Sequence, residues 1–322
     1  MKINDKVYGI ERVDENILVE LIKSDSLKRL KDISQLGMPD KYLNVKGFSR
    51  YEHSVGVMIL LKRLGAKLEE QVAGLLHDVS HTPFSHVIDW VIGDPTKEDY
   101  QDKIHEEFLK KSEIPSILRK RGFDLNFISN YHNFGLLEKD APSLCADRID
   151  YALREIVRKK GGNLVKRISD DLTVKENQIV FKNEDFAKIF GEEYMALQVK
   201  QWSGDEMGGR YYILSEILKK AFKENLIDMN HLKGTEKPLL KILWESRNEF
   251  ILYNLNMLKK GFKIIPDGNG IELKQKFRYI DPEVLMNGKY SPLSKISKDY
   301  FNLIELEKER SKEINKIKII PH

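Results

Sequence analysis

The sequence contains almost no cysteine, and this absence excludes two kinds of structural support. Its single cysteine, Cys145, cannot form an intrachain disulfide, and one thiolate is too few for a cysteine-based zinc site. Long apolar runs are also absent, since none approaches the ~20 residues that a bilayer-spanning helix requires. The opening stretch, Met1 to Lys6, already carries charged side chains and does not resemble a signal peptide. We therefore expect a cytoplasmic protein without membrane contact.

A strong charge of either sign is absent as well. The chain has 54 basic and 50 acidic residues, a formal net charge of +4 and a pI near 8.7. This balance does not indicate a dedicated nucleic-acid binder, although contact with nucleic acid is not excluded. The chain of 322 residues exceeds the usual size of one domain, and its hydrophobic share of 41% is sufficient for a core. We expect a catalytic core followed by a substantial C-terminal part.

Apolar residues recur mostly at three- and four-residue intervals, which predicts a mainly α fold. The pair Gly161-Gly162 is the clearest boundary, so we expect an HD-type helical core over residues 1–162 and a helical C-terminal region over 163–322. In the first part, the pattern predicts an extended piece over 2–11, and helices near 55–61 with Ser49 as N-cap, 72–76, from Thr82-Pro83 onward, 104–109 and 141–159. In the second part, it predicts hairpins near 172–182 and 262–273, helices over 186–201 and 211–222, and a charged helical tail from Tyr300 that includes Leu303, Ile304, Leu306 and Ile314.

Histidines are concentrated in the first part of the chain, where six of the eight fall between His53 and His132. Imidazoles and carboxylates are ligands for divalent ions such as Mg, Mn, Fe, Co, Ni and Zn. His77-Asp78 follows an apolar helical stretch, and neighbouring helical residues point about 100° apart, so both reach one ion only where the helix ends. With His53 and Asp147 on two further helices, four ligands could hold a divalent ion and leave positions open for water.

The order His53, His77-Asp78, Asp147 is similar to the H…HD…D signature of the HD superfamily of phosphohydrolases. The first ~160 residues resemble more closely the deoxynucleoside triphosphate triphosphohydrolases, which include bacterial dGTPases and the mammalian SAM-and-HD-domain enzyme. A lone HD dipeptide would be weak support, but five ordered blocks carry this resemblance. They are residues 30–37, 49–56, 73–86, 105–106 and 147–151.

The resemblance implies a role for each matched residue. It implies that the metal ligands are His53, His77, Asp78 and Asp147, and that the catalytic residues are Asp78, His81 and His105. Among these, His105 is the expected general acid for the leaving 5′ oxygen. The implied substrate contacts are Gln35 and Leu36 at the sugar, and Arg50, His86, Arg148 and Tyr151 around the phosphates. The implied reaction is attack of activated water on the α-phosphorus, which releases a deoxynucleoside and triphosphate.

Some segments depart from the family pattern. Lys23 and Lys31 stand where the mammalian enzyme reads an activating nucleotide, so activation of that kind is not expected. Residues 201–212 also depart from the helix that contacts nucleotide in the relatives, which leaves base and sugar preference open. For His132, which lies outside the matched blocks, we expect a buried structural role.

Two alternatives to a dNTP hydrolase therefore stay open. The first is another HD phosphohydrolase, a nucleotidase or phosphodiesterase that acts on nucleotides, cyclic nucleotides or oligonucleotides. The second is a non-catalytic nucleotide-binding protein. In each case we expect a nucleotide partner and a homo-oligomeric assembly.

Overall fold

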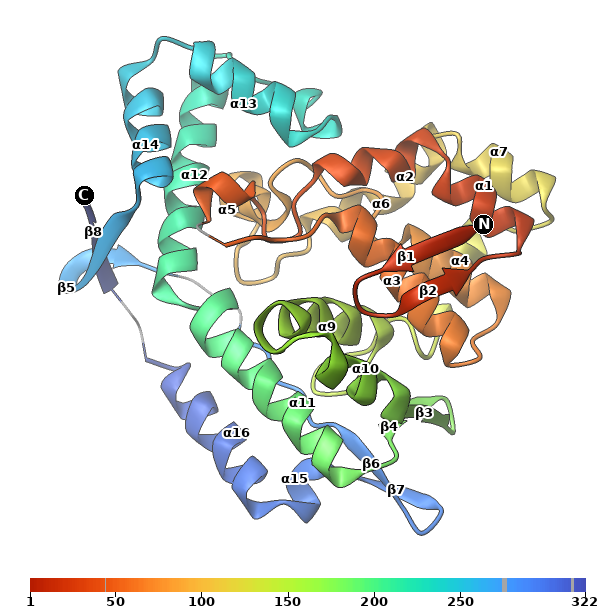
Figure 1. Cartoon of the computed structure of the whole chain (residues 1–322). Helices are drawn as coiled ribbons and strands as arrows, with labels where there is room; N and C mark the ends of the chain where they lie inside the picture. Colours follow the sequence, from red (N-terminus) through yellow and green to blue (C-terminus); the bar gives the residue numbers. More distant parts are fainter. Residues whose placement is uncertain (44, 274–276, 314–315) are drawn as a thin grey trace.

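The computed structural model describes residues 1–43, 45–273, 277–313 and 316–322. Most of them are helical, which confirms the predicted fold class (Figure 1). The elements up to residue 160 are β1 Lys2–Asp5, β2 Gly9–Arg12, α1 Asn16–Ile22, α2 Asp25–Arg29, α3 Arg50–Arg63, α4 Leu68–Leu76, α5 Asp89–Ile92, α6 Tyr100–Lys111, α7 Ile114–Lys120, α8 Leu125–Ser129 and α9 Ala146–Lys160. Those that follow are α10 Gly162–Asp171, β3 Leu172–Lys175, β4 Gln178–Phe181, α11 Glu184–Leu197, α12 Asp205–Lys223, α13 Glu236–Glu245, α14 Glu249–Lys260, β5 Phe262–Glu272, β6 Glu283–Met286, β7 Lys289–Pro292, α15 Leu293–Ile296, α16 Lys298–Arg310 and β8 Lys316–Pro321.

Helix α3 packs against both α4 and α9. It begins with a capping box, as the prediction of Ser49 as N-cap implies. The Ser49 hydroxyl accepts a hydrogen bond from the Glu52 amide, and the Glu52 carboxylate accepts one from the Ser49 amide. This box satisfies amide donors that the helix cannot pair internally and stabilises the helix by about 1 kcal/mol. It fixes the start of α3, and with it the position of His53 in the first turn.

Two hydrophobic cores hold the helices together. The main core contains residues from both sides of Gly162, including Ile149 on α9 and Phe190 on α11. The packing therefore does not separate at this point, and the division at residue 162 stays a prediction. The second core joins α12, α13 and α14 to two segments that precede α3 and α5, residues 36–43 and 84–88.

Short sheets decorate this helical body. Strands β3 and β4 pair antiparallel, with Leu172 opposite Phe181, where the first hairpin is expected. The same sheet continues through β6 and β7, because β4 pairs with β6 in parallel. The N-terminal stretch is also a hairpin, in which β1 and β2 pair antiparallel, instead of one extended piece.

The prediction of a second hairpin over residues 262–273 is wrong. Strand β5 runs through this whole stretch and pairs with the C-terminal strand β8, with a bulge between Pro266 and Ile271. The glycine-rich sequence, which predicts a turn, therefore forms an irregular part of a continuous strand. The charged tail helix is α16, but the chain ends in a strand; Ile314 lies outside the described residues.

Two predicted helix starts are also wrong. No helix begins at Thr82-Pro83, since Phe84 and Ser85 have positive φ values of 67° and 46°, and a 3-10 turn starts only at Ser85. Such left-handed residues interrupt helical hydrogen bonding. Helix α9 begins at Ala146 instead of residue 141, because Pro142 disfavours a helical conformation at Ala141 and Cys145 is extended.

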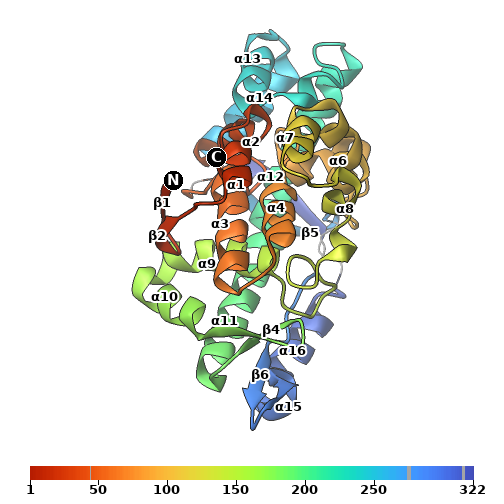
Figure 2. The same cartoon turned by 90° about the vertical axis from the view of Figure 1, so that its right-hand side faces the viewer.

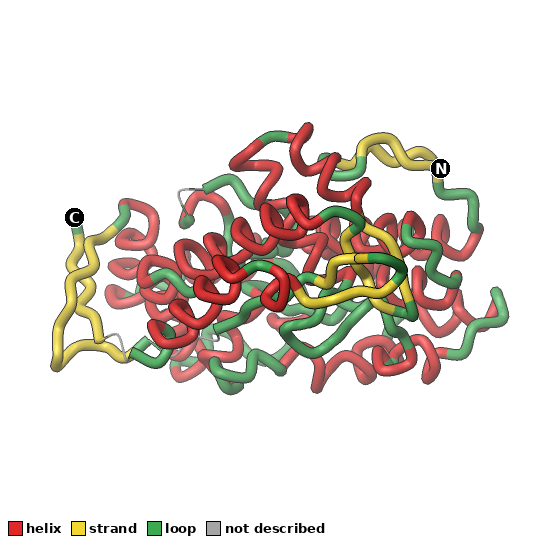
Figure 3. Tube along the Cα trace, turned by 90° about the horizontal axis from the view of Figure 1, so that it is seen from below, coloured by secondary structure: helices red, strands yellow, loops and turns green. Residues whose placement is uncertain are grey.

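The chain termini lie at opposite ends of the molecule. In the view from below, the sheet β5–β8 and the C-terminus lie at one end, and the N-terminus lies toward the other end (Figure 3). In the perpendicular view, α13 lies at one end and β6 with α15 at the other (Figure 2). Within the described residues, we find no helix whose length and hydropathy would allow it to cross a membrane.

Candidate metal centre

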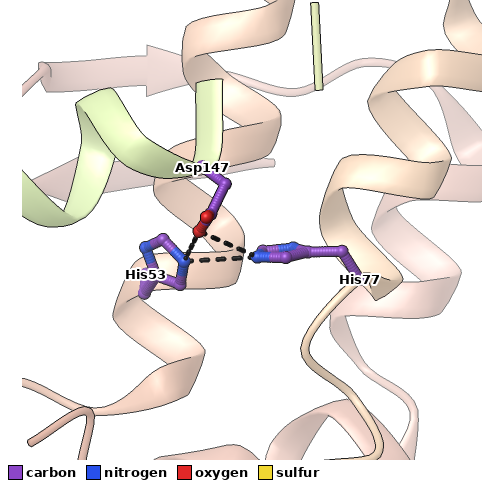
Figure 4. Close-up of side chains that lie close together, drawn as sticks. All are labelled: His53, His77 and Asp147. Carbon is purple, nitrogen blue, oxygen red and sulfur yellow. Dashed lines mark hydrogen bonds and ion pairs between the residues drawn. The ribbon is translucent and has the colours of Figure 1, made fainter. Parts of the chain in front are cut away.

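Three of the four predicted metal ligands come together from three helices (Figure 4). His53 comes from α3, His77 follows the last residue of α4, and Asp147 lies in the first turn of α9. The Asp147 Oδ1 atom is 2.8 Å from His53 Nε2 and 3.4 Å from His77 Nε2, and the two imidazole nitrogens are 3.2 Å apart. Two nitrogens and one oxygen that converge in this way form a donor set for a divalent transition metal.

The fourth predicted ligand, Asp78, lies beside this cluster. Its Oδ1 is 3.6 Å from His77 Nε2, and its Oδ2 is 3.7 Å from His53 Nε2. The same carboxylate makes an ion pair with Arg50, at 2.6 Å from Nη1, and lies 3.2 Å from His81 Nε2. Asp78 therefore joins the metal cluster to two of the residues expected to act on substrate.

The electrostatics of the cluster suit a cation. Burial lowers the pKa of His77, but the Asp78 and Asp147 carboxylates outweigh this effect and raise the pKa to about 9. Burial raises the pKa of Asp147, but His53 and His77 outweigh it and hold that pKa far below its usual value. The carboxylates thus stabilise positive charge at the imidazoles, and a divalent cation can supply that charge in place of protons. The donor set fits a metal ion.

Each imidazole is oriented through its other nitrogen. His77 Nδ1 is 2.7 Å from the Gly74 carbonyl, so it carries the proton and leaves Nε2 free for an ion. His53 Nδ1 is 2.8 Å from Asp150 Oδ2, and Arg154 Nε donates to the same oxygen at 2.7 Å. The sequence analysis did not identify Asp150, Arg154 or Gly74. The four-residue spacing of Asp150 and Arg154 on one helix was the only sequence signal for them.

The residues expected to contact substrate lie partly around this cluster. Arg50 is buried, and its Nε donates to the Ser85 hydroxyl at 2.9 Å. Its Nη2 is 3.5 Å from the Gln35 carbonyl, which brings the expected sugar-facing segment beside it. The next residue, Leu36, accepts a hydrogen bond at its carbonyl from the Tyr211 hydroxyl at 3.2 Å. Tyr211 therefore belongs to this side of the site, and it lies in the 201–212 segment that corresponds to the nucleotide-contacting helix of the relatives.

Arg148 and Tyr151 are held by other contacts in this structure. The Arg148 guanidinium donates to the carbonyls of Ser143 at 2.6 Å and Lys139 at 3.0 Å. The Tyr151 hydroxyl lies 2.7 Å from that of Tyr194, and its ring packs against Trp202. The Tyr151 ring is nevertheless 6.3 Å from the His53 ring, so it lines the cluster. Their roles as substrate contacts stay predictions.

The remaining histidines have different environments. His105 is buried; its Nδ1 lies 2.9 Å from the Ser80 hydroxyl, its Nε2 lies 2.6 Å from the Tyr131 hydroxyl, and burial lowers its pKa to about 4. His86 is partly exposed, with Asp89 at 3.3 Å from its Nδ1, and its ring packs edge-on against that of His81. His132 is exposed on a 3-10 turn, so the prediction of a buried role for it is wrong.

A second group of metal-type side chains, Glu138, Cys145 and Asp147, lies next to the first. The Arg148 guanidinium is 3.3 Å from Cys145 Sγ and 3.7 Å from Glu138. Because this guanidinium already supplies positive charge there, the group is a poorer cation site than the His53 cluster.

Comparison with known proteins agrees with this geometry. The HD domain family matches residues 50–155, which contain all four predicted ligands. The chain is 36% identical over 325 residues to the uncharacterized protein YdhJ of Bacillus subtilis, across 99% of both chains. It is 31% identical over 301 residues to the metal-dependent phosphohydrolase cns2 of Cordyceps militaris, across 90% of this chain and 86% of that one.

The fold is shared with a crystal structure of a phosphohydrolase from Bacteroides thetaiotaomicron, at a TM-score of 0.69 and 17% identity, across 100% of this chain and 99% of that one. The fold and the site thus define a hydrolase with a histidine–carboxylate metal centre. The chain belongs to the HD-domain family of metal-dependent phosphohydrolases. A deoxynucleoside triphosphate triphosphohydrolase, the SAMHD1 homolog of Dictyostelium discoideum, is a more distant relative, 24% identical across 58% of this chain and 42% of that one.

Proposed function

We propose that this phosphohydrolase acts on deoxynucleoside triphosphates and releases a deoxynucleoside and triphosphate. The observation that carries the proposal is the contact of Arg50 with the Gln35 carbonyl beside the metal cluster. It puts a guanidinium that can bind phosphate next to the segment expected to face the sugar. The distant dNTP triphosphohydrolase relative supports this substrate class.

The cluster of His53, His77 and Asp147, with Asp78 beside it, would hold the divalent ion. Such an ion acts as a Lewis acid on a phosphoryl oxygen and lowers the pKa of water. Arg50 is held between Asp78 and Ser85, so it is oriented before substrate arrives and stabilises negative charge on the transferred group. Asp78 orients both this arginine and His81.

The leaving oxygen requires a proton, and two histidines are candidates for its donor. The resemblance implies His105, but its ring nitrogens already lie within hydrogen-bonding distance of Ser80 and Tyr131, and its lowered pKa keeps it neutral near pH 7. His86 is partly exposed to solvent, its Nδ1 lies 3.3 Å from the Asp89 carboxylate, and its ring packs against that of His81, which contacts Asp78. We therefore propose His86 as the donor and His105 as the alternative.

Single alanine substitutions separate these two roles. Loss of the proton donor lowers kcat by ~10²–10⁴-fold with little change in KM. We expect His86→Ala to behave in this way. We expect His105→Ala to lower the melting temperature, because it removes the buried contacts with Ser80 and Tyr131 and leaves a cavity. Steady-state kinetics and thermal melting of both variants decide. If only His105→Ala has a lower kcat, and its melting temperature is unchanged, then His105 and not His86 is the proton donor.

A nucleotidase is the second candidate, and one observation favours it. Arg148, the second expected phosphate contact, is engaged with the carbonyls of Ser143 and Lys139, and it would have to leave them to bind a triphosphate. A monophosphate would need fewer of them.

A product assay distinguishes the candidates. Purified chain is incubated with dNTPs, NTPs, nucleoside monophosphates and cyclic nucleotides, each with Mg²⁺, Mn²⁺, Co²⁺ or Ni²⁺. Triphosphate release from dNTPs at higher rates than from NTPs supports the proposal. Orthophosphate release from monophosphates, with no triphosphate from dNTPs, refutes it and identifies a nucleotidase.

A further inference from the structure

A row of buried charged side chains connects the metal ligand His53 to the N-terminal hairpin. Asp150 lies 2.8 Å from His53 Nδ1 and accepts a hydrogen bond from Arg154 Nε at 2.7 Å. At its other end, Arg154 donates through Nη2 to Asp5 Oδ2 on β1, at 2.8 Å. None of these four side chains is accessible enough for water to replace its partners, since Asp5 is the most exposed at 8%.

The row has a net negative charge next to the imidazole. Its two carboxylates and one guanidinium sum to one negative charge, and they lie where solvent screening is weak. A carboxylate that accepts the Nδ1 proton of a ligand histidine fixes the ring and raises the basicity of Nε2. The charge of Asp5 therefore acts on His53 through two intervening groups.

The two carboxylate oxygens of Asp5 make different contacts. Oδ1 accepts hydrogen bonds from the Val7 amide at 2.8 Å and the Tyr8 amide at 3.1 Å, which closes the turn between β1 and β2. This local turn leaves Oδ2 directed at Arg154. The hairpin thus sets the orientation of the carboxylate that ends the row.

The neighbouring helix leaves space for this row. A Cβ atom at Gly56 on α3 would lie 1.9 Å from Arg154 Nη2 and 2.1 Å from Asp150 Oδ1, so only glycine fits there. On another side the Arg154 guanidinium faces the Phe48 ring, at 5.9 Å from its centroid. Close packing on both sides holds the row in one arrangement.

We propose that Asp5 is a positioning residue of the metal centre, which acts through Arg154 and Asp150 to fix the orientation and basicity of His53. The N-terminal hairpin is then a functional part of this centre, although Asp5 precedes the HD match over residues 50–155. The proposal concerns metal binding and holds whichever nucleotide is the substrate.

The variant Asp5→Asn separates the two contacts of this residue. Its single amide oxygen can still accept from the turn amides, but the other arm cannot accept from Arg154. Outer ligand partners typically contribute 10–100-fold to metal affinity, so we expect Mn²⁺ to bind about 10-fold more weakly. Asp14→Asn, which removes an exposed ion pair with Arg12 near the same hairpin, is the matched control and should bind Mn²⁺ like the wild type.

Titration calorimetry with Mn²⁺, and thermal melting in EDTA, test this on the full chain. Asp150→Asn should weaken Mn²⁺ binding as well, and adding Asp5→Asn to it should cause little further loss, because both act through one row. Weaker binding by Asp5→Asn at a melting temperature close to that of wild type supports the proposal. Wild-type Mn²⁺ affinity in Asp5→Asn overturns the proposal. Losses of affinity that are fully additive in the double variant, and that follow its melting temperature, indicate a structural role and overturn it as well.

Arg154→Lys provides a second test if Asp5→Asn does not fold. An ammonium keeps the positive charge but cannot bridge the two carboxylates in the fixed geometry of a guanidinium. We expect about 10-fold weaker Mn²⁺ binding in the folded variant. Unchanged affinity overturns the proposal.

Discussion

At the scale of the residue, the metal centre depends on a glycine that leaves space for the side chains beside it. Gly56 lies one helical turn beyond His53 on α3, and the space above its Cα is filled by Asp150 and Arg154. Asp150 also accepts a hydrogen bond from Arg154 Nε at 2.7 Å, so a displacement of Asp150 disturbs this contact as well. Any side chain at residue 56 must displace the pair that orients the ligand.

We therefore expect Gly56→Ala to destabilise the protein and to weaken metal binding. Forcing an extra methyl group into a packed site typically costs 1–3 kcal/mol, and here it also moves Asp150 away from His53. Urea unfolding and Mn²⁺ titration measure the two effects. Gly162→Ala is the matched control, since a Cβ there meets no atom within 4 Å and alanine is the better helix residue. Equal stability of the two variants would contradict this account of Gly56.

Two of the predicted ligands, His53 and His77, could be placed from sequence because each lies near a helix end that the sequence marks. The Ser49 cap fixes His53, and the apolar run before His77 locates the end of α4. Their outer partners could not be predicted, because Asp5 and Arg154 are 149 residues apart in sequence and meet only through tertiary packing. The environment of His105 could not be predicted from the sequence either, because Tyr131 contacts it from a separate turn.

At the scale of the element, a buried carboxylate on helix α13, that of Glu236, connects this helix to the segment beside the site. Glu236 accepts hydrogen bonds from the Ser34 amide and hydroxyl, both at 2.8 Å. The Ser34 carbonyl accepts from the Ser85 hydroxyl at 3.1 Å, and that hydroxyl accepts from Arg50. The C-terminal half thus supports the arginine expected to bind phosphate.

This contact predicts a pH-dependent stability. Burial raises the pKa of Glu236 to about 7, although its bonds with Ser34 and the charge of Arg50 oppose this. A carboxyl whose folded pKa exceeds its unfolded value near 4.5 stabilises the protein fully below pH 4.5, and the contribution is lost as pH rises through 7. We expect wild type to lose about 3 kcal/mol across this window relative to Glu236→Gln. Parallel urea-unfolding profiles of the two proteins from pH 4.5 to 8 would contradict it.

The mispredicted hairpin over residues 262–273 has a tertiary cause. The Asp267–Gly270 stretch carries strong turn residues, yet β5 passes through it, because its partner is the distant strand β8 and not its own continuation. The alternation of lysine and isoleucine over residues 316–319 was the available signal for that partner. Helices such as α6 could be predicted, because their apolar residues recur at three- and four-residue intervals in the sequence.

At the scale of the whole molecule, the β5–β8 sheet lies at one end (Figure 3). Its β8 strand nevertheless buries Ile317, which is 2% exposed, while Ile265 on β5 is 42% exposed. The sheet therefore stabilises the C-terminal part by packing, and it contributes none of the residues of the metal cluster.

We expect Ile317→Ala to lower stability by about 2–5 kcal/mol, as truncation of a buried isoleucine usually does. Metal affinity and kcat below the melting temperature should stay near wild type. Ile265→Ala on the same sheet is the control and should change stability by less than about 0.5 kcal/mol. Melting and turnover, measured together, check this. A loss of metal in folded Ile317→Ala would show that the sheet and the centre are coupled.

The central claim is that His53, His77 and Asp147 hold the divalent ion on which phosphoester hydrolysis depends. Metal analysis and product release, measured on the same preparations of wild type and His77→Ala, test it most directly. We predict that wild type retains a divalent ion and turns over a nucleotide, whereas folded His77→Ala loses both, because His53 and Asp147, with Asp78 beside them, cannot keep the site's geometry alone. A folded His77→Ala variant with near-normal metal content and turnover would contradict the account.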